Sequence, residues 1–216
     1  MQKVYFISGL GADERVFQYL NLEGIEPVFI QWLEPLSNEK IENYAARMSA
    51  FITTPRPLIV GLSFGGMITI EIAKSIDYQQ IILISSAKNR YDLPLLYRLS
   101  GRFNLHKILP IHFVKNIKIL RYFTFGIKTK SEKKLLDDMM NITSQNFQNW
   151  AMDVISKWQF DTILPRLTHL HGTRDWVLPN YKTADVLIKN GGHFMVVNEA
   201  EKVSFELKKL ILGVRY

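Results

Sequence analysis

The sequence predicts an α/β fold with three layers: a mostly parallel sheet of about six strands, helices on both faces, and a helical cap insertion. Three observations support this prediction. Short apolar runs alternate with helical patterns along the chain, which is typical of a parallel sheet with crossover helices. Most of these runs are apolar on both faces, as buried parallel strands are. The chain of 216 residues, 47% hydrophobic and 22% charged, has the size and composition of one globular domain.

The predicted strands share short apolar runs bounded by turn residues. They are residues 3–7, 27–32, 58–61, 80–85, 167–171 and 184–188. Helical periodicity predicts helices at residues 39–52, 65–76, 132–140 and 144–158. A last helix begins near Ala200, and Asn198 with Glu201 is expected to form its capping box.

The strand–helix alternation stops between residues 88 and 160, where Pro and Gly separate short helical pieces. We therefore expect residues 1–87 and 161–216 to form the core, and residues 88–160 to form a helical cap over one end of the sheet. The cap is also the basic part of the chain. From Lys88 to Lys134 there are 12 basic residues against two acidic ones, whereas the whole chain carries a net charge of +7. A partner attracted by positive charge is therefore expected at the cap.

The composition excludes several classes of function. The chain has no cysteine, which excludes disulfides, thiolate metal sites and cysteine nucleophiles and fits a cytoplasmic location. The apolar run within residues 1–9 is short and forms the first predicted strand, so we expect no signal peptide. No run approaches the roughly 18 apolar residues of a membrane helix, so we expect no transmembrane segment. No nucleic-acid-binding motif is present, and we expect no nucleic acid partner.

The strongest chemical signal is the segment Gly61-Leu62-Ser63-Phe64-Gly65, between a predicted strand and a predicted helix. A strand that turns directly into a helix forces a strained backbone at Ser63. The strand and the helix then crowd the positions two residues before and two residues after, so both are expected to need glycine. The serine hydroxyl would stand at the tip of the turn, near the positive end of the helix dipole, which suits a nucleophile. The alternative is an ordinary glycine-rich turn.

A serine hydroxyl needs a base to remove its proton, and the chain offers five histidines: His106, His112, His169, His171 and His193. His193 follows two glycines in a loop just after the last predicted strand, and we predict that it is the base. His169 and His171 alternate on one face of a strand, which is typical of buried core histidines; a metal-binding pair is the alternative. His106 and His112 lie in the predicted cap, where we expect them to be solvated, with a substrate contact as the alternative.

Asp175 is predicted to orient the base. It follows the strand at residues 167–171 and lies one loop before His193. A carboxylate there can reach an imidazole on the next loop and hold its tautomer. The alternative role is that of a turn or helix-cap aspartate. Asp92, which follows the preceding strand, is the alternative acid.

Glycines after the first strand predict an anion site. The segment at residues 8–11 lets the backbone bend, so that the N–H of Leu10, with that of Phe64 at the helix start, would form an oxyanion hole with two donors. The alternative is a plain glycine turn in which Asp13 caps the next helix. The segment lacks the third glycine of a dinucleotide-binding loop, so we predict no nicotinamide cofactor.

Together these motifs resemble the α/β-hydrolase superfamily over nearly the whole chain. The matching features are the loop at residues 8–11, the turn at residues 61–65, the helical segment at residues 88–160, and the order Ser63, Asp175, His193. The sequence departs from the superfamily pattern in three respects, of which one is that the step from Asp175 to His193 is short and leaves little more than one strand between the two loops. The first loop reads Ser-Gly where many members have His-Gly, and the chain begins at what would be the third strand, which shortens the expected sheet.

The resemblance implies a serine hydrolase without metal or cofactor. Ser63 would attack an acyl carbonyl, His193 would accept its proton, and Asp175 would hold the histidine tautomer. The amides of Leu10 and Phe64 would bind the oxyanion. We therefore expect hydrolysis of a small-molecule acyl ester of small or medium size through an acyl-enzyme.

Two alternatives stay open. A thioesterase acting on anionic acyl thioesters would use the same residues, with the basic cap attracting the substrate, an acyl carrier or an anionic lipid surface. A non-catalytic hydrolase-like fold that binds a ligand is the alternative of a different class. The sequence leaves the acyl group, the leaving group and the oligomeric state open.

Overall fold

A computed structural model describes residues 1–102, 118–179 and 181–213 of the chain. These residues include a six-stranded sheet, whose strands are β1 (Gln2–Ile7), β2 (Ile25–Ile30), β3 (Leu58–Leu62), β4 (Gln80–Ile84), β5 (Leu167–Gly172) and β6 (Val186–Ile188). The order across the sheet is β2-β1-β3-β4-β5-β6, and all five pairings are parallel. The predicted parallel sheet of six strands is therefore confirmed.

The register aligns the carboxyl ends of the strands along one edge of the sheet. Leu62 at the end of β3 lies opposite Ile84 at the end of β4, and Gly172 at the end of β5 lies opposite Ile188 at the end of β6. Loops that follow parallel strands leave from the same edge. The segments that the sequence predicts to carry the chemistry therefore gather at this edge.

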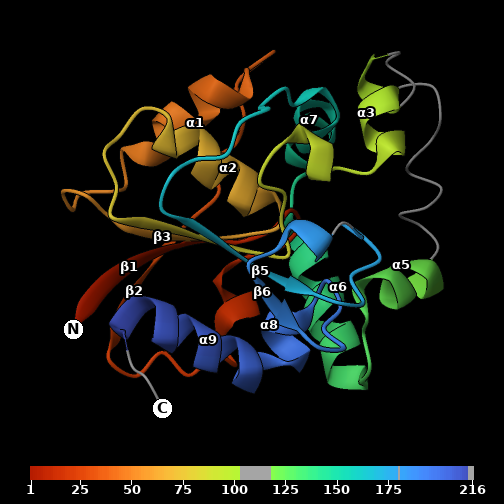
Figure 1. Cartoon of the computed structure of the whole chain (residues 1–216). Coiled ribbons are helices and arrows are strands. Elements are labelled where there is room, and N and C mark those ends of the chain that lie inside the picture. The colour runs from red at the N-terminus through yellow and green to blue at the C-terminus, as the bar shows by residue number, and fades with distance from the viewer. Residues whose placement is uncertain (103–117, 180, 214–216) are drawn as a thin grey trace.

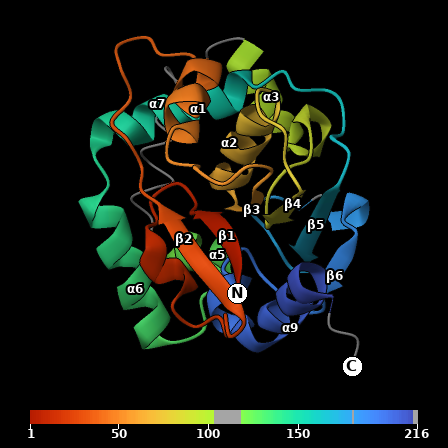
Figure 2. The ribbon, with the colours of Figure 1, turned by 90° about the vertical axis from the view of Figure 1, so that its left-hand side faces the viewer.

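One face of the sheet is covered by α1 (Ile41–Ser49), α2 (Phe64–Ala73) and α7 (Gln145–Lys157) (Figures 1 and 2). Their buried side chains pack against every second residue of the strands, among them Tyr5, Ile7, Ile59, Ile81 and Leu83. All ten residues of α2 are buried, so this helix lies inside the domain, as its nearly continuous apolar sequence requires.

The opposite face is covered by α9 (Ala200–Leu212) together with α8 (Met195–Asn198), the 3-10 helix η1 (Glu14–Phe17) and α6 (Lys130–Ile142) (Figure 1). The intervening strand residues pack on this side, among them Val4, Phe6, Val60, Ile82 and Ile84. Helices thus cover both faces, as predicted. None of the helices in the described residues combines the length and the apolar composition needed to cross a lipid bilayer.

Residues 88–160 contribute helices and, among their described residues, no strand. In chain order these are η2 (Arg90–Asp92), α3 (Leu95–Arg102), α5 (Lys118–Phe125), α6 and α7; a further 3-10 helix, η4 (Tyr181–Thr183), precedes β6. Met139 of α6 and Phe147 of α7 belong to the same apolar clusters as the sheet. These two helices therefore complete the core, and the division into a core and a cap stays a prediction.

β2 and β6 differ most from the sequence-based prediction, by two residues at an end, whereas the other four strands differ by one residue. β2 ends at Ile30, so Trp32 lies outside the sheet. Its ring packs against Phe64 and Phe147, with centroids 5.5 and 5.0 Å away, and its Nε1 donates to the Ala12 carbonyl at 3.1 Å. The strand predicted at Trp32 is therefore wrong, because this apolar side chain packs in a neighbouring aromatic cluster and not in the sheet. β6 has only three residues, Val186–Ile188.

The predicted capping box at the last helix is wrong. The N-cap of α9 is Glu199, which makes no side-chain capping bond. Asn198 instead ends the short helix α8, and its Nδ2 donates to the Gly126 carbonyl at 2.8 Å. The asparagine side chain therefore ties the end of α8 to the end of α5 and does not cap α9.

Phe147→Ala tests whether α7 is part of the core. Phe147 is 2% exposed and its ring contacts those of Trp32, Tyr44, Phe64 and Trp150. We expect the free energy of unfolding, measured by urea denaturation, to fall by about 3–5 kcal/mol.

The matched control is Phe51→Ala, because Phe51 is half exposed at the end of α1. Its loss should change the free energy of unfolding by less than about 0.5 kcal/mol. A Phe147→Ala variant as stable as the Phe51→Ala variant would contradict an integral α7.

Candidate active site

Ser63 stands at the turn between β3 and α2 with a strained backbone, φ 52° and ψ −120°. Two hydrogen bonds from the end of β4 and the loop after it hold this turn. The Ser63 N–H donates to the Ile84 carbonyl at 2.9 Å, and the Ser86 hydroxyl donates to the Ser63 carbonyl at 2.7 Å. The strain is therefore maintained by the neighbouring strand, which keeps the hydroxyl in one position.

Close packing explains both glycines of the Gly61–Gly65 pattern. A Cβ at Gly61 would lie 2.5 Å from the Gly66 Cα and from the Thr69 Oγ1. A Cβ at Gly65 would lie 2.2 Å from the Ser8 carbonyl oxygen. The steric reason that the sequence suggested, crowding between strand and helix, is the one that the structure gives.

The structure brings Ser63, His193 and Asp175 together in one chain of hydrogen bonds. Ser63 Oγ lies 2.9 Å from His193 Nε2, and His193 Nδ1 lies 2.7 Å from Asp175 Oδ2. An ionised carboxylate can only accept, so Nδ1 of His193 carries a proton, and in the neutral ring Nε2 is then free to accept from the Ser63 hydroxyl. His193 and Asp175 are both buried, which shields the pair from water.

The loops that carry Asp175 and His193 are joined through their backbones. A Cβ at Gly172 would lie 2.2 Å from the Gly191 carbonyl oxygen, so the two loops touch. The Arg174 N–H donates to the same Gly191 carbonyl at 2.8 Å. These contacts fix the distance between acid and base without using their side chains.

Asp175 is held as an anion. Burial alone would raise the pKa of its carboxyl, but the charge and hydrogen bond of His193, with His171 and the Leu178 N–H, outweigh burial and lower the pKa below its ordinary value of 3.8. Its second oxygen, Oδ1, accepts from the N–H groups of Val177 and Leu178, each at 2.9 Å. The carboxylate is therefore fully hydrogen-bonded while buried.

The loop after β1 lies directly against Ser63. A Cβ at Gly9 would be 3.3 Å from the Ser63 Cβ. Among the described residues, neither the Leu10 nor the Phe64 amide donates a hydrogen bond to another protein group. Asp13 caps η1 by accepting from the Arg15 N–H at 3.0 Å, so the capping role that the sequence offered as an alternative exists beside the two free amides. The arrangement leaves two donors available beside the hydroxyl.

The remaining candidates in the described residues make no hydrogen bond with Ser63 or His193. His169 and His171 are fully buried in β5, as expected of core histidines, and no group of three or more possible metal ligands occurs in the described part of the chain. Asp92 accepts from the Lys88 N–H at 2.8 Å, and it is Asp175 that contacts His193. His106 and His112 lie outside the described residues.

Ser63 and His193 open into a cavity of about 420 Å³. Its lining is mostly apolar and includes Leu10, Met67, Leu93, Leu96, Phe125 and Trp176. Polar side chains in the lining are Tyr97, Arg121, Thr124 and Gln148, which sequence reasoning did not single out. Burial, with the nearby charge of Asp175, raises the pKa of Tyr97, which keeps its hydroxyl neutral. A cavity of this size is typical of a site for a small ligand.

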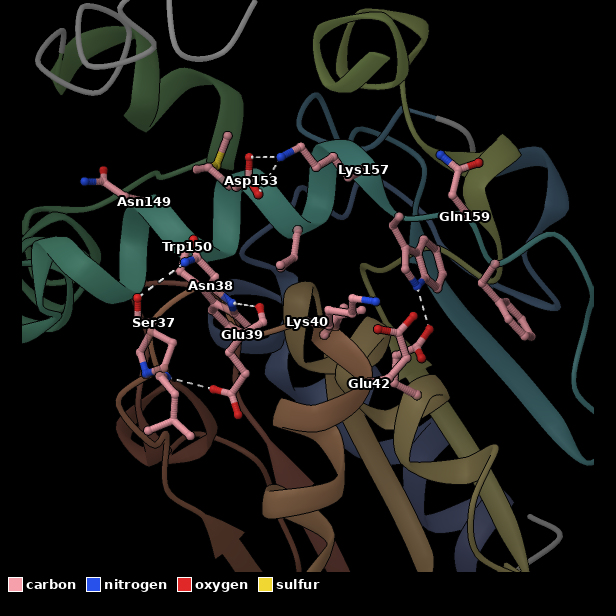
Figure 3. Close-up of a pocket in the computed structure, with 18 of the residues that line it drawn as sticks. Ser37, Asn38, Glu39, Lys40, Glu42, Asn149, Trp150, Asp153, Lys157 and Gln159 are labelled. Carbon is pink, nitrogen blue, oxygen red and sulfur yellow. Dashed lines mark hydrogen bonds and ion pairs between the residues drawn. The ribbon is translucent and has the colours of Figure 1, made fainter. Parts of the chain in front are cut away.

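A larger hollow, of about 1440 Å³, lies between α7 and the segment at residues 35–42 (Figure 3). Several of its charged groups pair with protein groups: Asp153 pairs with Lys157, and the Glu71 carboxylate accepts from Lys74 and from the Trp158 indole. None of the residues Ser63, His193 or Asp175 lines it. The smaller cavity is therefore the candidate active site, because only it reaches the hydrogen-bonded serine.

The comparisons with known proteins identify the fold. No model of a protein family and no curated protein matches the sequence. An esterase (EaEST) from Exiguobacterium antarcticum is similar with a TM-score of 0.74 at 14% identity, covering 98% of this chain and 92% of that one. An esterase from Thermogutta terrifontis gives 0.71 at 14% identity, over 100% and 91%. A bromoperoxidase from Bacillus anthracis gives 0.70 at 13% identity, over 98% and 92%. The chain has the α/β-hydrolase fold.

Gly65→Ala tests the packing of the turn. The new Cβ would lie within 2.4 Å of the carbonyl oxygens of Ile7 and Ser8, and backbone atoms of a sheet cannot move aside without cost. We expect the free energy of unfolding in urea to fall by about 1–3 kcal/mol. Gly9→Ala is the control, since its Cβ would meet its nearest atom at 3.3 Å and should cost less. Equal stability of Gly65→Ala and the unmodified chain would contradict this close approach.

Proposed function

We propose that this protein is a serine hydrolase that cleaves a carboxylic ester with a small or medium acyl group through an acyl-enzyme intermediate. The observation that carries this proposal is the chain Ser63–His193–Asp175, with successive distances of 2.9 and 2.7 Å, at the wall of a mostly apolar cavity. The names of the similar structures, esterases among them, support the same reaction class.

In the proposed mechanism the ester lies in the cavity with its carbonyl carbon next to Ser63 Oγ. His193 Nε2 takes the hydroxyl proton as the C–O bond forms, and the imidazolium is stabilised by the Asp175 carboxylate. The tetrahedral intermediate collapses, and His193 gives its proton to the leaving alcohol. Water, deprotonated by His193, then releases the acyl group and restores Ser63.

The negative oxygen of the tetrahedral intermediate needs donors that are already in position. The amides of Leu10 and Phe64 are proposed for this role, since both residues line the cavity and both N–H groups are free of other partners among the described residues. Each such donor is worth about 3 kcal/mol of barrier in enzymes of this type. The site needs no metal ion or organic cofactor for this chemistry.

The lining of the cavity supports an uncharged, apolar acyl group. Leu10, Met67, Leu93 and Phe125 surround the space beside Ser63. An acyl chain would be desolvated there at little cost, whereas an ionised group would lose its hydration. A non-catalytic binding protein is less favoured, because ligand binding alone does not need a serine aligned with a histidine and a carboxylate.

A cytoplasmic location, a thioester substrate and surface contact with an acyl carrier or anionic lipid stay predictions. The thioesterase alternative rests on the basic charge of residues 88–134, and on exposed cations such as Lys118 and Lys134 within it.

Ser63→Ala tests the nucleophile. A fluorophosphonate probe should label the unmodified protein at Ser63, and labelling and the turnover of p-nitrophenyl esters should both disappear in the variant. Ser75→Ala is the control: Ser75 lies just beyond the other end of α2, so its loss should leave both rates unchanged. Equal turnover by the protein with and without the Ser63 hydroxyl would refute the proposal.

The charge of the substrate separates ester from thioester hydrolysis. For neutral esters we expect kcat/KM to change by less than about twofold between low and moderate salt, because screening acts only between charges. An anionic acyl thioester that is turned over faster than the matched ester, with a steep loss of kcat/KM on adding salt, would favour the thioesterase instead.

A further inference from the structure

Two buried histidines lie directly behind Asp175 and take no part in the mechanism above. His171 Nε2 lies 2.8 Å from the Leu178 carbonyl oxygen and 3.4 Å from Asp175 Oδ2. On the other side of the ring, His171 Nδ1 lies 2.9 Å from His169 Nε2. The two histidines are 0% and 1% exposed. The Leu178 peptide, which contacts Asp175 through its N–H and His171 through its carbonyl, therefore links the carboxylate by hydrogen bonds to the two histidines in the core.

The partners of His171 determine where its proton lies. A carbonyl oxygen only accepts, so the short contact to Leu178 requires a proton on His171 Nε2. In a neutral ring Nδ1 is then an acceptor, and His169 must supply the proton between the two rings from its own Nε2. Nδ1 of His169 then carries no proton, and this atom has no hydrogen-bond partner among the described residues. The Ser86 backbone lies near the ring and by itself would favour a proton on this nitrogen, so the Leu178 carbonyl is what decides the tautomer.

The surroundings keep both rings neutral. Burial lowers the pKa of His169 far below its ordinary value, and the nearby His171 and Lys88 lower it further. Burial also lowers the pKa of His171, although the charges of Asp175 and Asp92 oppose this effect. The other charged group beside His169 is Asp185, whose carboxylate accepts from the His169 backbone N–H at 2.8 Å.

His171 and Asp175 hold the same peptide group from two sides. The Leu178 N–H donates to Asp175 Oδ1, while the Leu178 carbonyl accepts from His171. With its proton on Nε2, His171 also turns a positive N–H edge toward Asp175 Oδ2. The other tautomer would face the carboxylate with a lone pair and would leave the Leu178 carbonyl without this donor.

We propose that His171, with its tautomer fixed by His169, is a positioning residue that holds the Asp175 carboxylate in line with His193. The role rests on the proposed function of Ser63, His193 and Asp175. It differs from a structural role in one measurable respect: without His171 the carboxylate lies less well in line with His193 and stabilises the protonated base less. The base then loses its proton at lower pH.

NMR of the 15N-histidine-labelled protein tests the tautomers without any assay of activity. At neutral pH we expect His169 and His171 to be neutral with the proton on Nε2, and His193 to carry its proton on Nδ1. A His171 found with the proton on Nδ1 alone, or as an imidazolium, would overturn the proposal.

Variants test the effect on the base, with the pH dependence of fluorophosphonate labelling at Ser63 as the readout. In His171→Phe we expect the maximal labelling rate to fall by about tenfold or more, because the carboxylate is less well aligned. The acid limb of the labelling rate should move to lower pH by about half a unit or more, because a misaligned carboxylate stabilises the protonated base less. His171→Gln should restore most of the labelling rate and most of the original position of the acid limb, since an amide offers a donor and an acceptor at similar positions. His171→Met also lacks the donor, and its flexible side chain fits a core more easily if the phenylalanine variant does not fold.

Tyr78→Phe is the matched control. It also removes a buried donor to a backbone carbonyl, that of Pro165 at 2.9 Å, but it does so before β4, at the other end of the sheet. It should lower stability without moving the acid limb. If the acid limb of labelling in both His171→Phe and His171→Met lies at the same pH as in the unmodified protein, the proposal is overturned. Absence of labelling in the unmodified protein would instead contradict the proposed function, and the NMR measurement would then decide the inference by itself.

Discussion

The close approach of the first turn of α2 to the end of β1 is the constraint on which the site depends. Gly65 lies so near the carbonyl oxygens of Ile7 and Ser8 that no side chain fits between them. This contact brings the loop after β1 against Ser63, and Leu10 and Phe64, whose amides have no hydrogen-bond partner among the described residues, line the cavity with it. The strained φ of Ser63 is the local cost of this arrangement, and the hydrogen bonds from the β4 side hold it in place.

A second set of backbone contacts positions Asp175 and His193, as the first set positions Ser63. Gly172 and Gly191 touch, and the Arg174 N–H donates to the Gly191 carbonyl. Because both loops follow neighbouring parallel strands, the chain needs only one short crossover to bring Asp175 and His193 within 2.7 Å. Contacts between backbone atoms thus set the geometry of the site, and they position the side chains of Ser63, Asp175 and His193.

The sequence predicts the features that local patterns encode. The six strands and the turn at Ser63 follow from short apolar runs and from glycine spacing, and the order of Ser63, Asp175 and His193 identifies the three residues that the fold brings together. Features that depend on distant packing are not predicted. The strand predicted at Trp32 is wrong because the neighbouring sequence does not indicate the aromatic cluster that this residue joins.

The same limit applies to the polar residues of the site. Asn198 matched a capping pattern, but its partner is the Gly126 carbonyl, 72 positions away. Tyr97 reaches the cavity from α3, and no motif marks it. Ser86 holds the Ser63 carbonyl from the end of β4, and its position just after a predicted strand was the only signal that could have found it. His171 was predicted to be buried, but its contact with Asp175 depends on the path of the loop between them.

The end of α5 contacts the loop of His193 through one hydrogen bond and close packing. The Phe194 N–H donates to the Phe125 carbonyl at 3.0 Å, the Phe125 ring meets the His193 ring edge-on at 5.1 Å, and Gly126 touches Gly192. Residues of α5 also line the cavity, so a displacement of this helix would move a wall of the cavity and the loop of His193 together. In the proposed mechanism the width of the cavity and the alignment of His193 with Ser63 are therefore coupled, and a substrate large enough to displace α5 would also disturb that alignment.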